Sequence, residues 1–249
     1  MNILVTGSSG YIAANLIPML NLAGHNVVSY DIIEGRDILD KDKLVSYMEY
    51  CDVVIHLAAI VGIMDCEKDP QAAIKTNLIG TKNVVDIAES YNIPVIYAST
   101  FAAKAPFNVY GLTKRLSEYL VLNKNGVVLR MANIYGGEKY LTKGSVVCSF
   151  IKKKRRNEVA EIHGDGSQLR DFIHVKDVCR AYIDALEAPS GIYEVSTNTF
   201  TTILELADKM GVKYMMVSPR PDTPETSNTH VPNWKPTITL EEGLREFEQ

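Results

Sequence analysis

The sequence contains little cysteine, one tryptophan and no long apolar run. Its 249 residues include four scattered cysteines, none of them in a C-x-x-C or histidine-linked spacing. This arrangement argues against a disulfide framework and a zinc site, so we expect reduced, mostly buried thiols and no bound metal. No stretch approaches the roughly 20 consecutive apolar residues that a membrane span requires. The sequence therefore predicts neither a membrane protein nor a disulfide-stabilised secreted domain.

An excess of basic residues is also missing. The 26 Lys and Arg residues stand against 30 Asp and Glu residues, which gives a formal net charge of −4. Since a phosphate-binding face needs a basic excess, we expect no nucleic-acid partner. The basic run 152–156 could be a phosphate or targeting patch, but it follows an apolar stretch, and we interpret it as the solvated end of a helix. No basic leader precedes the apolar opening 3–5, so we expect a cytoplasmic protein.

What is present is a repeated pattern of short apolar runs followed by helical segments. Hydrophobic residues make up 46% and charged residues 22% of the chain, as in soluble domains. The β-branched runs are 3–5, 27–30, 53–55, 95–97 and 127–129. Continuously apolar strands are buried on both faces, which indicates a parallel sheet covered by helices. The first half therefore predicts an α/β fold with a doubly wound, Rossmann-like parallel sheet.

After about Asn133 this rhythm breaks. Glycine-rich and charged stretches follow, and helical patterns return at 178–186, 203–210 and 240–247. The pattern predicts a smaller C-terminal α/β region that lies over one end of the sheet.

Two glycines follow the first predicted strand directly. Gly7 and Gly10 lie where a dinucleotide pyrophosphate meets the N-terminal amides of a helix, and glycine lets the backbone approach the phosphates there. Ala13 stands where a third glycine would pack the helix on the sheet. The alternative is a strand-to-helix turn that merely needs two glycines.

Asp31 ends the second predicted strand, about 20 residues after the glycines. A carboxylate at this place accepts both ribose hydroxyls of NAD and repels a 2′-phosphate. No basic residue follows directly, since Ile32, Ile33 and Glu34 come next, so we expect NAD in preference to NADP. A turn or helix-capping aspartate is the alternative interpretation.

Tyr110 and Lys114 carry the most specific chemical signal. Residues four apart on a helix project from the same face, so the phenol and the ammonium converge. A nearby ammonium and the positive nicotinamide ring would lower the phenol pKa from its usual value of about 10. Tyr110 could then remove a hydroxyl proton as hydride leaves the same carbon. Thr100 follows the fourth strand at the same edge of the sheet and can share that proton.

In this order, these features resemble the extended short-chain dehydrogenase/reductase family, and within it the nucleotide-sugar epimerases of the UDP-glucose 4-epimerase type. The resemblance covers nearly the whole chain. It is carried by Thr6-Gly7-x-x-Gly10-Tyr11-Ile12, Asp31, Asp37-Ile38, 52–59, Asn77-x-x-Gly80-Thr81-x-Asn83, Ser99-Thr100, Tyr110-x-x-x-Lys114, Arg130-x-x-Asn133-x-Tyr135-Gly136, 164–177, Arg220-x-Asp222, and Trp234-x-Pro236 with 240–244.

The resemblance implies a role for each matching position. Thr100, Tyr110 and Lys114 would be catalytic, and Lys114 would also bind the nicotinamide ribose. The residues implied to bind or support NAD are Gly7, Gly10, Tyr11, Ile12, Asp31, Asp37, Ile38, Leu57, Ala58, Ala59, Asn77, Tyr110 and Lys114. Asn133, Arg170 and Arg220 would hold the substrate diphosphate, although Arg170 could instead pair with Asp171 or Asp165.

The implied function is NAD-dependent 4-epimerisation of a nucleotide-diphosphate sugar. A nucleotide-sugar reductase or dehydrogenase, and a non-catalytic dinucleotide-binding sensor, are the alternatives. The resemblance also implies a homodimer, which here would pair through the helices around 72–88 and 110–122. Residues 1–133 plus 172–188 would form the NAD-binding domain, and 134–171 plus 189–249 the substrate-binding region.

Two departures from the family concern the segment between Thr100 and Tyr110. It has only nine residues, 101–109, where sugar epimerases carry a longer loop, and this removes wall from the substrate pocket. Phe101-Ala102 replaces the Asp-Glu pair of sugar 4,6-dehydratases, which argues against dehydration. We expect His56 and His174 to be buried structural histidines and Trp234 to be a core residue.

Overall fold

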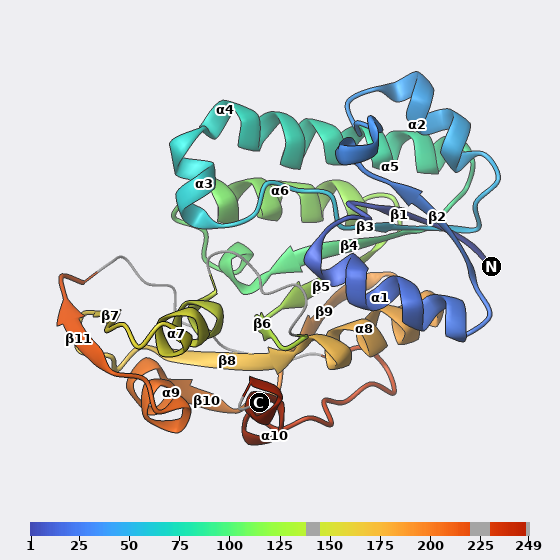
Figure 1. Cartoon of the computed structure of the whole chain (residues 1–249). Coiled ribbons are helices and arrows are strands. Elements are labelled where there is room, and N and C mark those ends of the chain that lie inside the picture. The colour runs from blue at the N-terminus through green and yellow to red at the C-terminus, as the bar shows by residue number, and fades with distance from the viewer. Residues whose placement is uncertain (138–144, 220–229, 248–249) are drawn as a thin grey trace.

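Six parallel strands in the order β2-β1-β3-β4-β5-β9 form the central sheet (Figure 1). The computed structural model describes residues 1–137, 145–219 and 230–247. The strands are β1 (Asn2–Thr6), β2 (Asn26–Tyr30), β3 (Val53–His56), β4 (Val95–Thr100), β5 (Val127–Met131) and β9 (Gly191–Val195). In register, Ile3 of β1 pairs with Val27 on one side and Val53 on the other. The doubly wound parallel sheet predicted from the apolar runs is confirmed.

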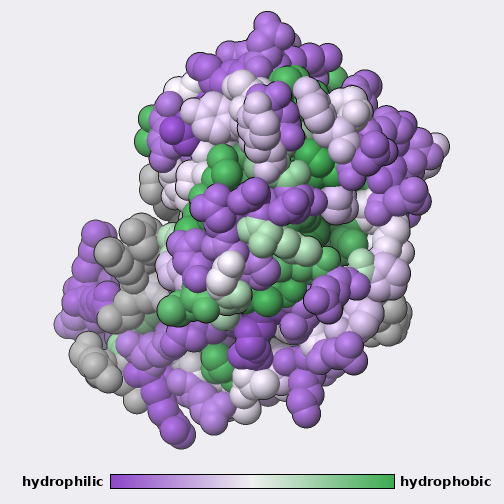
Figure 2. Space-filling model, turned by 90° about the vertical axis from the view of Figure 1, so that its right-hand side faces the viewer, coloured by the Kyte–Doolittle hydropathy of each residue, from purple (hydrophilic) through white to green (hydrophobic). Residues whose placement is uncertain are grey.

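Helices cover both faces of this sheet (Figure 1). On one face α1 (Tyr11–Leu22) packs against α8 (Val175–Asp184), and on the other lie α2 (Lys41–Met48), α5 (Thr81–Ser90) and α6 (Val109–Leu122). Between β3 and α5 the chain forms α3 (Ile63–Lys68), α4 (Pro70–Ala73) and the π-helical turn η2 (Ile74–Gly80). On the side view, apolar side chains gather across the middle of the molecule, with hydrophilic ones above and below (Figure 2).

The strand order reverses between β1 and β3. Such a switch point opens a crevice at the carboxyl ends of the two strands, and ligands of open α/β sheets bind there. Gly7 follows β1 and Leu57 follows β3, so both lie at the mouth of this crevice.

In the part of the chain that the structure describes, the smaller region contains a three-stranded sheet, a strand pair and three α-helices. The sheet has β6 (Asn133–Tyr135), β8 (Leu169–His174) and β10 (Phe200–Thr202), and β7 (Ala160–His163) pairs with β11 (Tyr214–Val217). The helices are α7 (Val146–Arg155), α9 (Ile203–Met210) and α10 (Leu240–Leu244). β9 lies in the main sheet, so a boundary at residue 188 leaves out one of its strands.

Local signals explain where several of these helices begin and end. Thr202 and Glu205 form a reciprocal capping box at the start of α9, and Gly211 ends it with a left-handed φ of 61°. Asn108 caps α6, its side-chain oxygen accepting a hydrogen bond from the Gly111 amide at 2.8 Å. The basic run 152–156 forms the last turn of α7 and its C-cap, and its residues are exposed except Lys153, which is partly exposed, so the predicted solvated helix end is present.

The cysteines, Trp234 and His174 are buried, as expected from the sequence. All four cysteines are free and buried, and Trp234 is buried in the main core with its indole N–H donating to the Asp177 carbonyl at 3.0 Å. His174 is buried and its ring contacts Glu246. Among the described residues, no cluster of side chains could hold a metal ion, and no helix is long and apolar enough to span a bilayer.

Candidate active site

One pocket of about 940 Å³ extends from the glycine turn to the smaller region. It is lined by fifteen of the seventeen residues predicted from the sequence: Gly7, Gly10, Tyr11, Ile12, Asp31, Asp37, Ile38, Leu57, Ala58, Ala59, Thr100, Tyr110, Lys114, Asn133 and Arg170. Asn77 lies behind the wall, and Arg220 lies outside the described residues. Residues far apart in the sequence are thus brought together at the carboxyl edge of the sheet.

The turn after β1 fits a pyrophosphate. Gly7 has a φ of 71°, and a Cβ atom there would lie 2.7 Å from the backbone nitrogen of Ala58, so a side chain cannot be placed without displacing the neighbouring loop. Helix α1 begins at Tyr11 without a side-chain cap, which leaves its first amides and positive dipole end facing the pocket. A dinucleotide phosphate group matches this donor set.

Asp31 holds the adjoining turn together and also faces the pocket. Its carboxylate accepts hydrogen bonds from the amides of Ser9 at 2.9 Å and Ile33 at 3.0 Å. In the protein without a ligand, Asp31 thus acts as the turn and capping aspartate of the alternative interpretation. The remaining lone pairs of its carboxylate can still accept hydrogen bonds from ribose hydroxyls. The nearest pocket-lining cation, Arg36, is engaged by Glu34 at 2.6 Å and stacks over the Tyr47 ring.

Asn77 supports the pocket from behind. Its side-chain oxygen accepts from the Ile60 amide at 2.8 Å, and its Nδ2 donates to the Ile60 carbonyl at 2.9 Å. These two hydrogen bonds hold the segment that follows Ala59. The pocket that contains Tyr110 is lined in this segment by Ile60, Val61 and Gly62. π-helical turns such as η2 occur frequently at functional sites.

A series of buried hydrogen bonds from Asn77 through His56 also holds this wall of the pocket. The Thr81 hydroxyl donates to the Asn77 carbonyl at 2.6 Å, so its oxygen must accept from His56 Nε2, 2.9 Å away. His56 Nδ1 then accepts from the Thr6 hydroxyl at 2.6 Å. Burial, and to a smaller extent Lys114, lower the pKa of His56 to about 3, so this histidine is neutral and structural.

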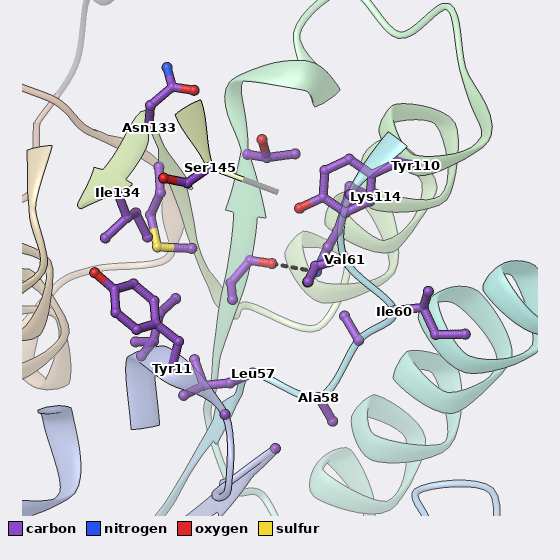
Figure 3. Close-up of a pocket in the computed structure, with 18 of the residues that line it drawn as sticks. Tyr11, Leu57, Ala58, Ile60, Val61, Tyr110, Lys114, Asn133, Ile134 and Ser145 are labelled. Atoms are coloured by element: carbon purple, nitrogen blue, oxygen red, sulfur yellow. Dashed lines mark hydrogen bonds between the residues drawn. The ribbon is translucent and has the colours of Figure 1, made fainter. Parts of the chain in front are cut away.

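Tyr110 and Lys114 extend from α6 toward the strand ends (Figure 3). The Tyr110 hydroxyl points into the pocket, with Tyr11, Asn133, Ile134 and Ser145 on the opposite wall. Lys114 Nζ donates to the Ala98 carbonyl at 2.9 Å and lies 4.8 Å from the centre of the Tyr97 ring. Thr100 stands beside them at the end of β4 and its hydroxyl oxygen accepts from the Ala102 amide at 3.3 Å.

In the protein alone, the pKa of Tyr110 moves opposite to the expected direction. Burial is the largest cause and Cys66 adds to it, so the pKa rises to about 12, while a hydrogen bond from Thr100 acts in the lowering direction. Burial also lowers the pKa of Lys114 to about 8, against opposing contributions from Cys66 and Glu118. Desolvation is thus the largest cause of both pKa shifts.

The substrate side of the pocket contains predicted and unpredicted residues. Asn133 donates to the Asp171 carbonyl at 3.1 Å, and Arg170 donates to the Leu169 carbonyl at 2.8 Å. Ser145, Val61, His163 and other lining residues were not predicted. Gln168 could have been predicted from the sequence, since it belongs to the 164–177 motif. Ser145 and Val61 lie in segments without any local sequence pattern.

The match to a known family covers most of the chain. The profile of the NAD dependent epimerase/dehydratase family matches residues 3–196. The chain belongs to this family. The NAD-dependent epimerase/dehydratase family includes the extended short-chain dehydrogenase/reductase enzymes that the motifs resemble, and the glycine turn and the Thr100, Tyr110 and Lys114 side chains lie within the matched residues.

Three similar proteins span the whole length of this epimerase/dehydratase family member. A putative UDP-glucose 4-epimerase of Methanocaldococcus jannaschii is 28% identical over 98% of this chain and 96% of that protein. UDP-glucuronic acid decarboxylase 6 of Arabidopsis thaliana is 27% identical over 100% of this chain and 88% of that protein. A crystal structure of the Thermotoga maritima UDP-glucose 4-epimerase with UDP-glucose has a TM-score of 0.89 at 26% identity, covering 98% of this chain and 96% of that one.

Proposed function

We propose that the protein is a UDP-sugar 4-epimerase that retains NAD through the catalytic cycle. The observation that carries the proposal is the position of the Thr100, Tyr110 and Lys114 group. It lies in one continuous pocket between the phosphate-binding turn at Gly7 and the candidate diphosphate ligand Arg170. The similarity to the archaeal and bacterial 4-epimerases supports the choice of reaction.

The proposed chemistry divides between the cofactor and the chain. When bound, NAD supplies a reversible hydride acceptor and a positive charge that favours the Tyr110 phenolate. Tyr110 takes the proton of the sugar 4-hydroxyl as hydride leaves C4, which gives a ketone, and it returns the proton when hydride comes back after the sugar has turned over. Thr100 donates to the phenol oxygen, and Lys114 keeps a positive charge behind it.

The substrate ligands must hold the diphosphate while the sugar turns. We propose that Asn133, Arg170 and Arg220 do this at the nucleotide end. A guanidinium fork matches phosphate oxygens in pairs, so the nucleotide is anchored while the sugar is free to rotate about its bonds to the diphosphate. Ile134, Val61 and Ser145 then form the walls between which the sugar rotates.

A direct assay tests the proposed reaction. Purified protein is incubated with UDP-glucose and, in a separate sample, with UDP-glucuronate, in both cases without added cofactor. The sugar signals are followed by proton NMR, and mass spectrometry identifies the dinucleotide released on denaturation. We expect UDP-galactose to form and NAD to be recovered near one per chain. Conversion of UDP-glucuronate to UDP-xylose and CO₂ would instead assign decarboxylation, release of a keto sugar would assign a dehydrogenase, and bound NAD without turnover would assign a sensor.

We further propose that the protein is a homodimer paired through α5 and α6. Leu112, Leu116 and Tyr119 lie at helical spacing on α6, and 48%, 53% and 70% of their surfaces are exposed. Apolar groups this exposed along one helix face indicate a protein contact. The neighbouring η2 turn continues the face with Ile79.

Leu116→Glu should convert the dimer to a monomer. A charge at the centre of an apolar contact is buried without a partner, whereas in the monomer the same side chain lies in solvent, so folding is retained. Light scattering after gel filtration measures the mass. The matched control is Leu22→Glu, at an exposed leucine on α1, which should leave the mass unchanged. A wild-type monomer, or a dimer that tolerates Leu116→Glu, would contradict the proposed interface.

A further inference from the structure

Glu118 is a buried carboxylate on the helix that carries the reaction centre. It follows Lys114 by one turn and Tyr110 by two, so the three side chains lie along one face of α6. Only 1% of its surface is exposed. A carboxylate in such a place is stable only when other groups satisfy its charge and lone pairs.

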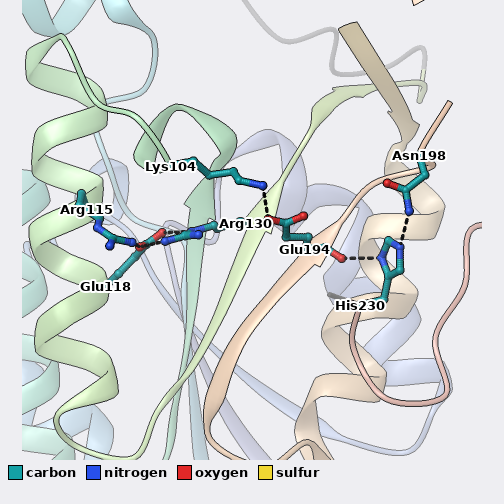
Figure 4. Close-up of polar contacts among 7 residues, drawn as sticks. All are labelled: Lys104, Arg115, Glu118, Arg130, Glu194, Asn198 and His230. Carbon is teal, nitrogen blue, oxygen red and sulfur yellow. Dashed lines mark hydrogen bonds and ion pairs between the residues drawn. The ribbon is translucent and has the colours of Figure 1, made fainter. Parts of the chain in front are cut away.

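Four hydrogen bonds reach this carboxylate from three elements, and Figure 4 shows the two arginines among the donors. Arg130 of β5 binds both oxygens, through Nε at 2.8 Å and Nη2 at 2.7 Å. The Ser99 hydroxyl of β4 donates at 2.5 Å, and Arg115 of α6 donates at 3.2 Å from a half-exposed position. The two-pronged arginine contact fixes orientation as well as charge.

Three consecutive residues of β4 therefore meet three residues of α6. The Ala98 carbonyl accepts from Lys114, the Ser99 hydroxyl donates to Glu118, and Thr100 hydrogen bonds Tyr110. The first and third contacts belong to the candidate reaction centre. The middle contact ties the same strand to the same helix through a charged, fully buried group.

We propose that Glu118 is a positioning residue of the reaction centre, whose carboxylate fixes α6 on β4 and keeps Lys114 in its ammonium form. This inference rests on the proposed function for its catalytic consequence. Its electrostatic part concerns the protein itself and stands independently of the reaction.

The surroundings of Lys114 explain why a carboxylate is needed there. Burial disfavours the ammonium, and the groups facing it are Tyr110 and Glu118 on α6, Tyr97 on β4, Cys66 on α3 and His56 on β3. His56 is neutral, and burial raises the pKa of the Cys66 thiol, so that it too is neutral at pH 7. Glu118 is the acidic side chain among these groups and is bound by the Arg130 and Arg115 guanidiniums. Burial is the largest cause of the lowered pKa of Lys114, and Cys66 and Glu118 act in the raising direction.

Glu118→Gln tests the inference because it removes the charge and keeps the shape. The ammonium then loses a neighbouring acidic group and still faces the Arg130 guanidinium, so we expect the pKa of Lys114 to fall by about one unit, a tenfold change in its equilibrium constant. The ¹³Cε signal of Lys114, assigned by its absence in Lys114→Arg, measures this titration in the NAD-bound protein. The alkaline limb of the kcat profile should move down by the same amount, with KM little changed.

A matched control and a second variant keep the test decisive. Glu158→Gln removes an exposed glutamate that pairs with Lys153 at 3.0 Å. It should change neither the Lys114 ¹³Cε titration nor the alkaline limb of the kcat profile. Should Glu118→Gln fold poorly, Glu118→Gln/Arg130→Gln removes both buried charges and should lower the Lys114 titration by a smaller amount. A folded variant with an unchanged Lys114 titration overturns the inference. A shifted titration in a protein that turns over no UDP-sugar overturns the proposed function instead.

Discussion

Tyr110→Phe should reduce kcat by about 10²–10⁴-fold, the usual contribution of a positioned acid–base group. The substitution removes the phenol oxygen and leaves the ring, so the packing of α6 on the pocket wall is retained. Without that oxygen, no group at this position can take the 4-hydroxyl proton while hydride leaves C4. NAD should remain bound near one per chain, since the phosphate-binding turn at Gly7 is untouched.

The control for this variant removes a phenol oxygen elsewhere. Tyr50 follows α2, and 77% of its surface is exposed, so Tyr50→Phe should leave kcat, KM and bound NAD unchanged. Turnover by Tyr110→Phe within tenfold of the unmodified protein would remove Tyr110 from its proposed role. Single-turnover measurements at saturating substrate separate the chemical step from product release.

The positions of the phosphate-binding turn and of Asp31 could be predicted because each directly follows a strand. In a parallel sheet all carboxyl ends meet at one edge, so residues after separate apolar runs must converge. The i,i+4 spacing placed Tyr110 and Lys114 on one face of a helix in the same way. These predictions needed only local periodicity and the rule for parallel strands.

Contacts that depend on tertiary packing could not be predicted. The strand β9 contains Glu194, which interrupts the apolar run and hides a strand of the main sheet. The structure accommodates this charge because Lys104, from the short segment 101–109, forms an ion pair with the Glu194 carboxylate at 2.5 Å. The backbone carbonyl of Glu194 accepts a hydrogen bond from His230. No pattern in the sequence relates residues 90 positions apart in this way.

In the protein without NAD, the pKa of Tyr110 is raised for a related reason. Spacing on a helix predicts that two charged groups lie close together, but it does not predict how deeply they are buried. Lys114 is almost fully buried, and its ammonium binds the Ala98 carbonyl and the Tyr97 ring. Desolvation is therefore the largest cause of both pKa shifts, and neither the depth of burial nor the contacts of Glu118 with Ser99 and Arg130 could be read from spacing on a helix.

Gly7→Ala should abolish tight NAD binding while leaving a folded protein. A Cβ atom at this position would lie 2.7 Å from the Ala58 nitrogen and 2.8 Å from its Cα, both well inside van der Waals contact. These atoms belong to backbone that is held by the Thr6 and Asn77 hydrogen bonds, so the loop cannot yield without moving the pocket wall. A displacement approaching 1 Å costs about 10²-fold where geometry is critical, and we expect at least that loss in NAD affinity by calorimetry.

Gly24→Ala separates this clash from backbone strain. Gly24 also has a positive φ, 84°, but no atom lies within 4 Å of its virtual Cβ. Both variants should therefore lose about 1–2 kcal/mol of folding free energy to the left-handed conformation, and Gly7→Ala should lose more because of its clash, as measured by urea unfolding without NAD. Only Gly7→Ala should also lose the additional stabilisation that NAD gives. Equal NAD affinity in the two variants would show that the dinucleotide does not bind at the turn after β1.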